Sequence, residues 1–157
     1  MSRVSIYAFA IAAALLLLSS AKAQHWTYGK GCAGLNFVWK GTARLGTILT
    51  AKLTTTTPGA PGLVVIGWPW PCRVVPQHLT RQPGCLSCIF PLPGATVPIL
   101  TNVWGIYHHD IGIPNDRALV GLSVAVQFWV GHPPVAGDRN WASSNAGWFR
   151  VRSWGGG

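Results

Sequence analysis

Acidic side chains are almost missing from this chain of 157 residues. It has no glutamate and only three acidic residues, all aspartate, against twelve lysines and arginines. Three carboxylates leave little room for the paired acids of a glycosidase, for a metal hydrolase or for a Ser-His-Asp enzyme. Charged residues make up only 10% of the chain, which argues against a helix-rich protein covered with surface ion pairs.

Motifs for catalysis and nucleotide binding are also missing. No serine lies in a G-x-S-x-G elbow, and neither a P-loop nor a dinucleotide-binding fingerprint occurs. No stretch after the first 23 residues reaches eighteen uninterrupted apolar residues, so we expect no membrane span in the mature protein. The sequence therefore predicts no catalytic residue and no cofactor, and we interpret the protein as a non-enzyme.

The first 23 residues have the three parts of a secretory signal peptide. Arg3 supplies the positive start, residues 6–18 form the apolar run, and Ala21-Lys22-Ala23 matches the small-x-small cleavage pattern. We expect a signal-peptide helix that is removed after Ala23, with an uncleaved membrane anchor as the alternative. Residues 24–157 would then form one secreted domain outside the cell, in the periplasm or at the cell surface.

Four cysteines lie after the leader, at positions 32, 72, 85 and 88. An even number of cysteines in an exported protein favours disulfides. Four cysteines allow three pairings, and their spacing does not choose among them. Cys85 and Cys88 form a C-x-x-C, which in another context indicates redox chemistry or half of a zinc site. Because there is no second C-x-x-C and no βαβ pattern, we expect structural disulfides.

Short runs of β-branched and aromatic residues between glycines, prolines and asparagines predict strands. They span residues 35–39, 47–57, 63–68, 86–90, 103–111, 119–130 and 147–154. In one of them Leu49, Ala51 and Leu53 share a face, which is the period of a half-buried strand. The pattern predicts an all-β fold, a single antiparallel β-sandwich of seven to eight strands, Ig-like or jelly-roll-like. The one helix signal is Asp116, which can cap a single turn.

Several short motifs follow one another in an order known from one family. They are Tyr28-Gly-Lys-Gly-Cys32, Pro83-Gly-Cys85, Ile113-Pro-Asn-Asp116-Arg-Ala-Leu-Val-Gly-Leu122, Gln127 and Ser144-Asn145. The chain thereby resembles small secreted β-sandwich domains of unknown function that are common in planctomycetes and other environmental bacteria. The resemblance implies a secreted β-sandwich with a disulfide between Cys32 and Cys85. By exclusion, Cys72 would then pair with Cys88.

The densest cluster of candidate metal ligands is His108-His109-Asp110. On a strand, His108 and Asp110 share one face and His109 points to the other. Two such ligands could hold part of a zinc or copper site, completed by one of the distant histidines, His25, His78 or His132. Because nothing in the sequence brings those histidines together, we expect no metal site and keep His108 and Asp110 as the alternative.

Tryptophan and arginine form the most informative pattern. If Phe149 and Val151 face the core, the period of two sends Trp148, Arg150 and Arg152 outward together. Exposed aromatic rings stack on sugars or bases, and arginines bind phosphate, sulfate or carboxylate. Should the last strand share a sheet with residues 121–130, the same surface gains an aromatic ring and the amide of Gln127. The residues expected to bind a ligand are Trp68, Trp70, Trp129, Trp148, Arg150 and Arg152.

Two functions fit these features. The first is a non-catalytic binding or adhesion module for an anionic polysaccharide or another cell-envelope polymer. The formal charge of +7 that remains without Arg3 and Lys22 would draw the protein to such polymers. The alternative is a structural subunit that self-associates through exposed sheet edges. We expect no sequence-specific nucleic-acid partner. An exposed Trp/Arg patch favours the first function, and a long, flat, uncharged edge favours the second.

Overall fold

A computed structural model describes residues 25–80, 83–132 and 140–154. The expected signal peptide and its cleavage site lie outside these residues. The described residues form eight strands, one helical turn, α2 (Gln77–Thr80), and one 3-10 turn, η1 (Arg117–Leu119). This confirms the predicted all-β fold. No helix among the described residues is long and apolar enough to cross a membrane.

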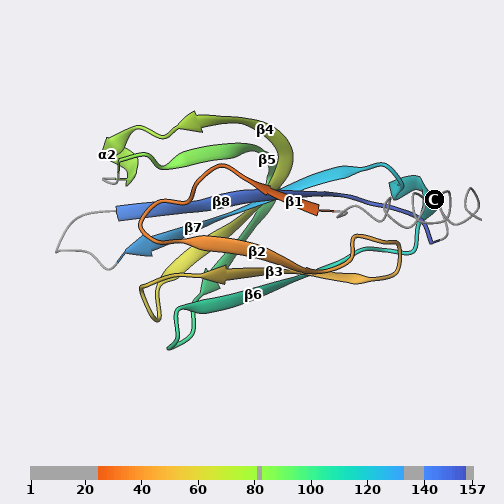
Figure 1. Cartoon of the computed structure of the whole chain (residues 1–157), viewed down its shortest axis with the longest axis horizontal. Helices are drawn as coiled ribbons and strands as arrows, with labels where there is room; N and C mark the ends of the chain where they lie inside the picture. Colours follow the sequence, from red (N-terminus) through yellow and green to blue (C-terminus); the bar gives the residue numbers. More distant parts are fainter. Residues whose placement is uncertain (1–24, 81–82, 133–139, 155–157) are drawn as a thin grey trace, which may run out of the picture.

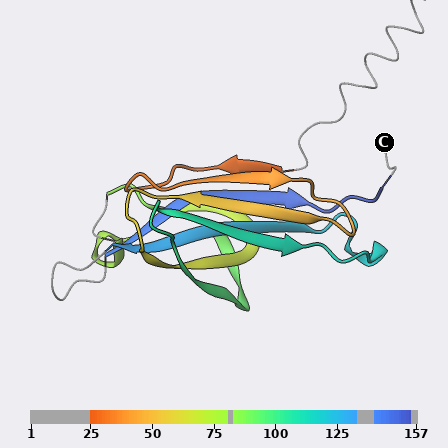
Figure 2. The same ribbon diagram turned by 90° about the horizontal axis from the view of Figure 1, so that it is seen from below.

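The strands form two antiparallel sheets that pack face to face (Figure 1). The five-stranded sheet has the order β1-β8-β7-β4-β5, and the three-stranded sheet has the order β2-β3-β6. Figure 2 shows the molecule from the side of the three-stranded sheet. The strands are β1 (His25–Tyr28), β2 (Asn36–Gly41), β3 (Ile48–Thr54), β4 (Pro61–Val74), β5 (Leu86–Leu100), β6 (Ile106–Gly112), β7 (Ser123–His132) and β8 (Asn140–Arg150).

Alternating apolar side chains of the two sheets fill the core between them. Leu49, Ala51 and Leu53 of β3 are fully buried, as the alternation in the sequence predicts. On the opposite sheet, Val126 and Phe128 of β7 are also fully buried, and they belong to the same cluster as Ala51 and Leu53. Burying one such large side chain contributes roughly 1.5–3 kcal/mol, so this interface is the main source of stability.

The distal parts of β4 and β5 fold back over the outer face of the five-stranded sheet (Figure 1). β4 pairs with β7 only from Gly62 to Gly67, and beyond that point its only partner is β5. The register between β4 and β5 breaks twice, and such irregularities bend strands. At Gly67 a Cβ atom would collide with the carbonyl oxygen of Phe90, so this close approach requires glycine. We call residues 68–80 and 83–90 the folded-back hairpin.

Two disulfides fix this arrangement. Cys32 bonds to Cys85 and Cys72 bonds to Cys88, which confirms both expected pairings. The first joins the loop after β1 to the start of β5 and is buried in the core, whereas the second lies within the folded-back hairpin. Cys85 and Cys88 each have a different partner, so the C-x-x-C does not close on itself. The two bonds indicate an oxidising, extracellular environment.

Candidate functional site

The end of β8 turns its polar residues away from the core. Phe149 and Val151 are 2% and 3% exposed, so they face the core as the alternation predicts. Arg150, between them, is exposed, and β8 ends there. Arg152 continues the chain as a half-buried residue that meets Arg44 in an isolated parallel bridge. The chain after β8 is thereby held against the loop between β2 and β3.

Four arginines from different segments gather at this end of the sandwich. The guanidinium carbon of Arg44 lies 5.2 Å from the ring centroid of Trp154, a cation–π contact. Arg150 donates a hydrogen bond from Nε to the carbonyl oxygen of Gly121 at 3.1 Å, which ties β8 to the turn after η1. Arg117 belongs to η1 itself. We define the arginine end as Arg44, Arg117, Arg150, Arg152 and Trp154.

An open pocket of about 420 Å³ lies at the arginine end. Trp154, which is 64% exposed, forms part of its wall. The indole Nε1 of Trp154 donates to the carbonyl oxygen of Leu45 at 2.7 Å, so the ring is held in place. The other lining residues include Asn115, Arg117, Val120 and Ser153. A fixed aromatic ring beside a guanidinium and an amide suits a ring-shaped, negatively charged ligand.

The positive charge of the arginine end is not neutralised by ion pairs within the described residues. Asp116 is the one acidic residue of the pocket region, and its Oδ1 accepts the backbone N–H of Ala118 at 2.9 Å. Asp116 therefore caps η1, which confirms its predicted role. The Nε of Arg44 is buried and has no hydrogen-bond partner among the described residues. Several cations around one carboxylate leave a positive surface that attracts anions.

Trp148 and Trp129 are only partly available to a ligand. Both are half-buried on the outer face of the five-stranded sheet. Trp148 stacks on Trp26 of the neighbouring strand β1, with ring centroids 4.3 Å apart, and it also packs against the cluster under the folded-back hairpin. Aromatic pairs of this kind contribute about 0.5–1.5 kcal/mol beyond the area they bury. Trp148 is therefore engaged in packing, and Trp129 offers only part of its ring to a ligand.

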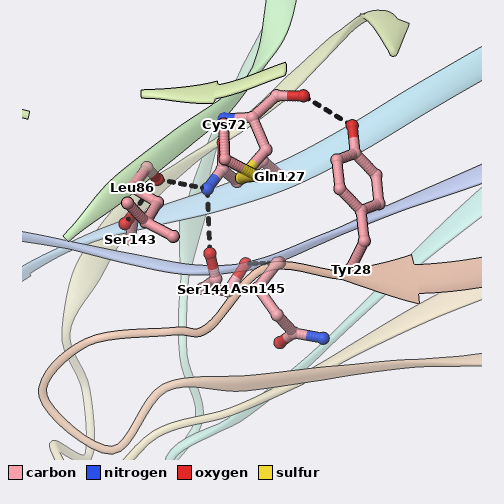
Figure 3. Close-up of a disulfide and its surroundings, with 8 residues drawn as sticks. Tyr28, Cys72, Leu86, Gln127, Ser143, Ser144 and Asn145 are labelled. Atoms are coloured by element: carbon pink, nitrogen blue, oxygen red, sulfur yellow. Dashed lines mark hydrogen bonds between the residues drawn. A yellow bond between two sulfur atoms is a disulfide. The ribbon is translucent and has the colours of Figure 1, made fainter. Parts of the chain in front are cut away.

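Gln127 differs from expectation, because its amide is not on the surface. The folded-back hairpin covers it, and the side chain is fully buried. Its Oε1 accepts the backbone N–H of Cys88 at 3.1 Å. Its Nε2 donates to the carbonyl oxygens of Leu86 at 2.7 Å and Ser144 at 2.8 Å (Figure 3). The expectation of an exposed amide beside Trp129 is thus wrong, and Gln127 links the sheet to the hairpin.

Trp68 and Trp70 form a second surface on the folded-back hairpin. They are 41% and 45% exposed and lie where β4 no longer pairs with β7. Phe90 faces Trp68 across the hairpin, is 54% exposed, and has its ring centroid 5.6 Å from that of Trp70. Pro69 and Pro71 flank these indoles in a part of β4 that, among the described residues, pairs with β5 and no longer with β7. Sequence reasoning did not find Phe90, whose partner is set by long-range pairing.

The histidine cluster lies on β6 and does not line the pocket. His108 and Asp110 are exposed and His109 is half-buried, consistent with the predicted alternation. Asp110 accepts a hydrogen bond from the Thr50 hydroxyl at 2.6 Å. No three His, Cys, Asp or Glu side chains come together in the part of the chain that the structure describes. Of the distant histidines, His25 lies beside Trp39 and His78 lies on α2.

We expect His109 to make the stability of the fold depend on pH. Its ring lies beside Tyr107, and burial lowers the pKa of His109, an effect that the Asp110 carboxylate partly offsets. The folded state favours the neutral ring. The contribution of His109 to the free energy of unfolding is therefore fully present above its unfolded pKa of about 6.5, and it is lost as the pH drops below that value. We expect His109→Gln to reduce the loss of unfolding free energy between neutral pH and mildly acidic pH in urea titrations. His108→Gln, at the exposed neighbour, should leave that loss unchanged, and an identical loss in both variants would contradict the assignment.

Comparisons of the chain with protein-family models, with curated proteins and with solved structures find no match. The resemblance to the planctomycete domains therefore stays a prediction. The function has to be inferred from the geometry of the two surfaces.

Proposed function

We propose that this chain is a secreted, non-catalytic module that binds anionic polysaccharides, or similar anionic polymers of a cell envelope, through the arginine end. The observation that carries the proposal is the set of arginines at the arginine end, which have no ion pairs among the described residues and of which Arg117 lines the pocket beside Trp154. Guanidinium groups bind carboxylate and sulfate oxygens through paired N–H donors. The indole of Trp154 offers a flat surface for the ring of the same sugar unit.

The described carboxylates support a role without catalysis. Asp110 lies on β6 and accepts a hydrogen bond from Thr50, whereas Asp116 caps η1. The two acids belong to different segments and each has a structural partner. Glycosidase-type chemistry needs two such groups facing one substrate bond, and this pair of described acids belongs to different segments.

The edges of the five-stranded sheet favour binding over self-association. β5 is an edge strand and contains Pro91, Pro93 and Pro98, which cannot donate hydrogen bonds to an added strand. The opposite edge, β1, is only four residues long. Edges of this kind resist pairing with another chain. The two disulfides and the leader-like sequence of residues 1–23 support export, which would bring the arginine end to envelope polymers.

Removing two arginines should weaken binding without unfolding the protein. We expect Arg150→Ala combined with Arg152→Ala to lower the affinity for heparin, used as a test polyanion, by roughly tenfold, because charged hydrogen bonds are lost. The affinity of the unchanged protein should fall as salt rises, since the arginine contacts are screened. Affinity chromatography and titration calorimetry measure the effect, and the thermal midpoint should stay nearly the same.

A matched control separates a specific site from net charge. Lys40 and Lys52 lie on the outer face of the three-stranded sheet, and Lys40→Ala with Lys52→Ala removes the same charge. This control should bind heparin nearly as well as the unchanged protein. Equal losses in both double variants would show that only net charge matters, and no loss in the arginine variant would refute the site. An array of sulfated and uronic-acid glycans would then identify the preferred polymer.

A further inference from the structure

The folded-back hairpin concentrates exposed apolar side chains. Besides the three aromatic residues Trp68, Trp70 and Phe90, it exposes two aliphatic residues, Val74 at 71% and Leu79 at 52%. A monomeric protein seldom exposes that many large apolar side chains in one short segment unless the segment meets a partner. None of these five residues belongs to the arginine end.

The apolar residues follow an order along the hairpin. Val74 is the last residue of β4, and Leu79 lies in α2, which closes the hairpin at the far end (Figure 1). Trp68 and Phe90 pair with each other nearer to the point where β4 leaves the sheet. The aliphatic side chains are thus at the tip, and the aromatic rings are behind them. Lipid bilayers favour this order, because aliphatic groups enter the acyl region and Trp prefers the headgroup interface.

The charge of the hairpin fits a negatively charged surface. Residues 68–90 contain no aspartate or glutamate, and Arg73 is exposed directly beside Val74. A basic residue next to inserted apolar side chains can contact lipid phosphates. A sugar chain would use the aromatic rings but would gain little from Val74 and Leu79, so the aliphatic tip favours lipid over glycan.

The hairpin is held rigidly, so these side chains stay presented. The Cys72–Cys88 disulfide closes it, and the hydroxyl of Tyr28 donates to the carbonyl oxygen of Cys88 (Figure 3). Gln127 binds the backbone of both Leu86 and Cys88 from below. A surface that needs no ordering on contact loses less conformational entropy when it binds.

We propose that the folded-back hairpin docks on the surface of an anionic lipid bilayer. Leu79 and Val74 enter the outer acyl region, the rings of Trp68, Trp70 and Phe90 lie at the headgroups, and Arg73 contacts phosphate. This is attachment to one leaflet and not a membrane span. The arginine end remains a separate surface for polymers, so the protein would bridge a membrane and an anionic polymer.

Vesicle binding of the whole oxidised protein tests the proposal. We expect it to sediment with vesicles of mixed phosphatidylcholine and phosphatidylglycerol, and less with phosphatidylcholine alone. Val74→Ser with Leu79→Ser should reduce the partition coefficient by roughly tenfold, since two apolar side chains no longer leave water. These substitutions keep every tryptophan, so the fluorescence of the variant can be compared with that of the unchanged protein. Quenching of this fluorescence by brominated lipids should fall together with the partition coefficient.

The matched control removes equally exposed apolar residues elsewhere. Val103→Ser with Trp104→Ser changes the loop between β5 and β6, where the two residues are 75% and 77% exposed, and it should leave vesicle binding unchanged. The hairpin variant should keep its heparin affinity. A loss of vesicle binding can therefore be distinguished from a loss of polymer binding at the arginine end. Equal vesicle binding by both variants would overturn the proposal. The proposal would also be overturned if the hairpin variant kept its vesicle binding but lost either self-association, measured as mass by size-exclusion chromatography, or binding to an insoluble uncharged polysaccharide.

Discussion

Replacing Cys32 and Cys85 by alanine should lower the free energy of unfolding by about 4 kcal/mol. The two residues are 53 positions apart, and in the chain-entropy model a loop of that size strongly restricts the unfolded chain. The same bond holds the loop after β1 on β8. The N–H of Cys32 donates to the carbonyl oxygen of Ser143 at 2.8 Å, and the N–H of Ser143 points to the sulfur of Cys32 at 3.1 Å.

The second disulfide provides the comparison. Cys72→Ala with Cys88→Ala opens a loop of only 16 residues, so we expect about 3 kcal/mol. Its loss should also be local, with faster amide exchange in the folded-back hairpin before the sandwich unfolds. Guanidinium titrations measure both free energies, and hydrogen exchange locates the opening. A larger cost for the shorter loop, or unchanged exchange in the hairpin, would contradict this division of roles.

Features that depend on local sequence could be predicted. The alternation of Leu49, Ala51 and Leu53 sets which face of β3 is buried, and the same rule places Phe149 and Val151 in the core. Asp116 caps η1 because an Asx side chain reaches a backbone N–H two residues on. Each of these outcomes follows from neighbours along the chain, so the residues themselves contain the information.

Features that depend on distant pairing could not be predicted. Strand β1 is a short edge whose stability comes from β8, and β4 extends past Trp68 through prolines that are tolerated because β5 is its only partner there. The strand period shows which residues share a face, but it does not show that another segment covers that face. Gln127 is therefore buried by the folded-back hairpin although its face was expected to be open.

The arginine end was predicted only in part. The last predicted strand, residues 147–154, indicated Arg150 and Arg152 and also contains Trp154, but Arg44 and Arg117 come from two other places in the chain. No local pattern connects them, because the contact arises when the chain after β8 meets the loop between β2 and β3. Conversely, Trp68 and Trp70 were grouped with these arginines in the sequence analysis and lie on a different surface.

Gln127→Leu should cost roughly 2–4 kcal/mol of unfolding free energy, although leucine has a similar volume. The amide makes three hydrogen bonds under the folded-back hairpin. The substitution leaves the N–H of Cys88 and the carbonyl oxygen of Ser144 buried without this partner, and each such group costs about 1–3 kcal/mol. The carbonyl oxygen of Leu86 keeps a hydrogen bond, because the hydroxyl of Ser143 also donates to it at 2.9 Å.

The Gln127→Glu variant shows whether the hydrogen bonds or the shape of the side chain matter. A protonated carboxyl can still donate to one carbonyl oxygen and accept from Cys88, whereas an ionised carboxylate has no donor and faces the carbonyl oxygens of Leu86 and Ser144. Burial therefore raises the folded-state pKa of this carboxyl above its unfolded value of about 4.3. Stability should be close to that of the unchanged protein below that pH and should fall as the pH rises through the folded-state pKa. Urea titrations across this range measure the fall.

Gln77→Leu, at an exposed glutamine in α2, should change stability by no more than about 0.5 kcal/mol at any pH. A pH-independent Gln127→Glu variant would mean that water reaches the amide, and the hairpin would then not seal the outer face of the sheet.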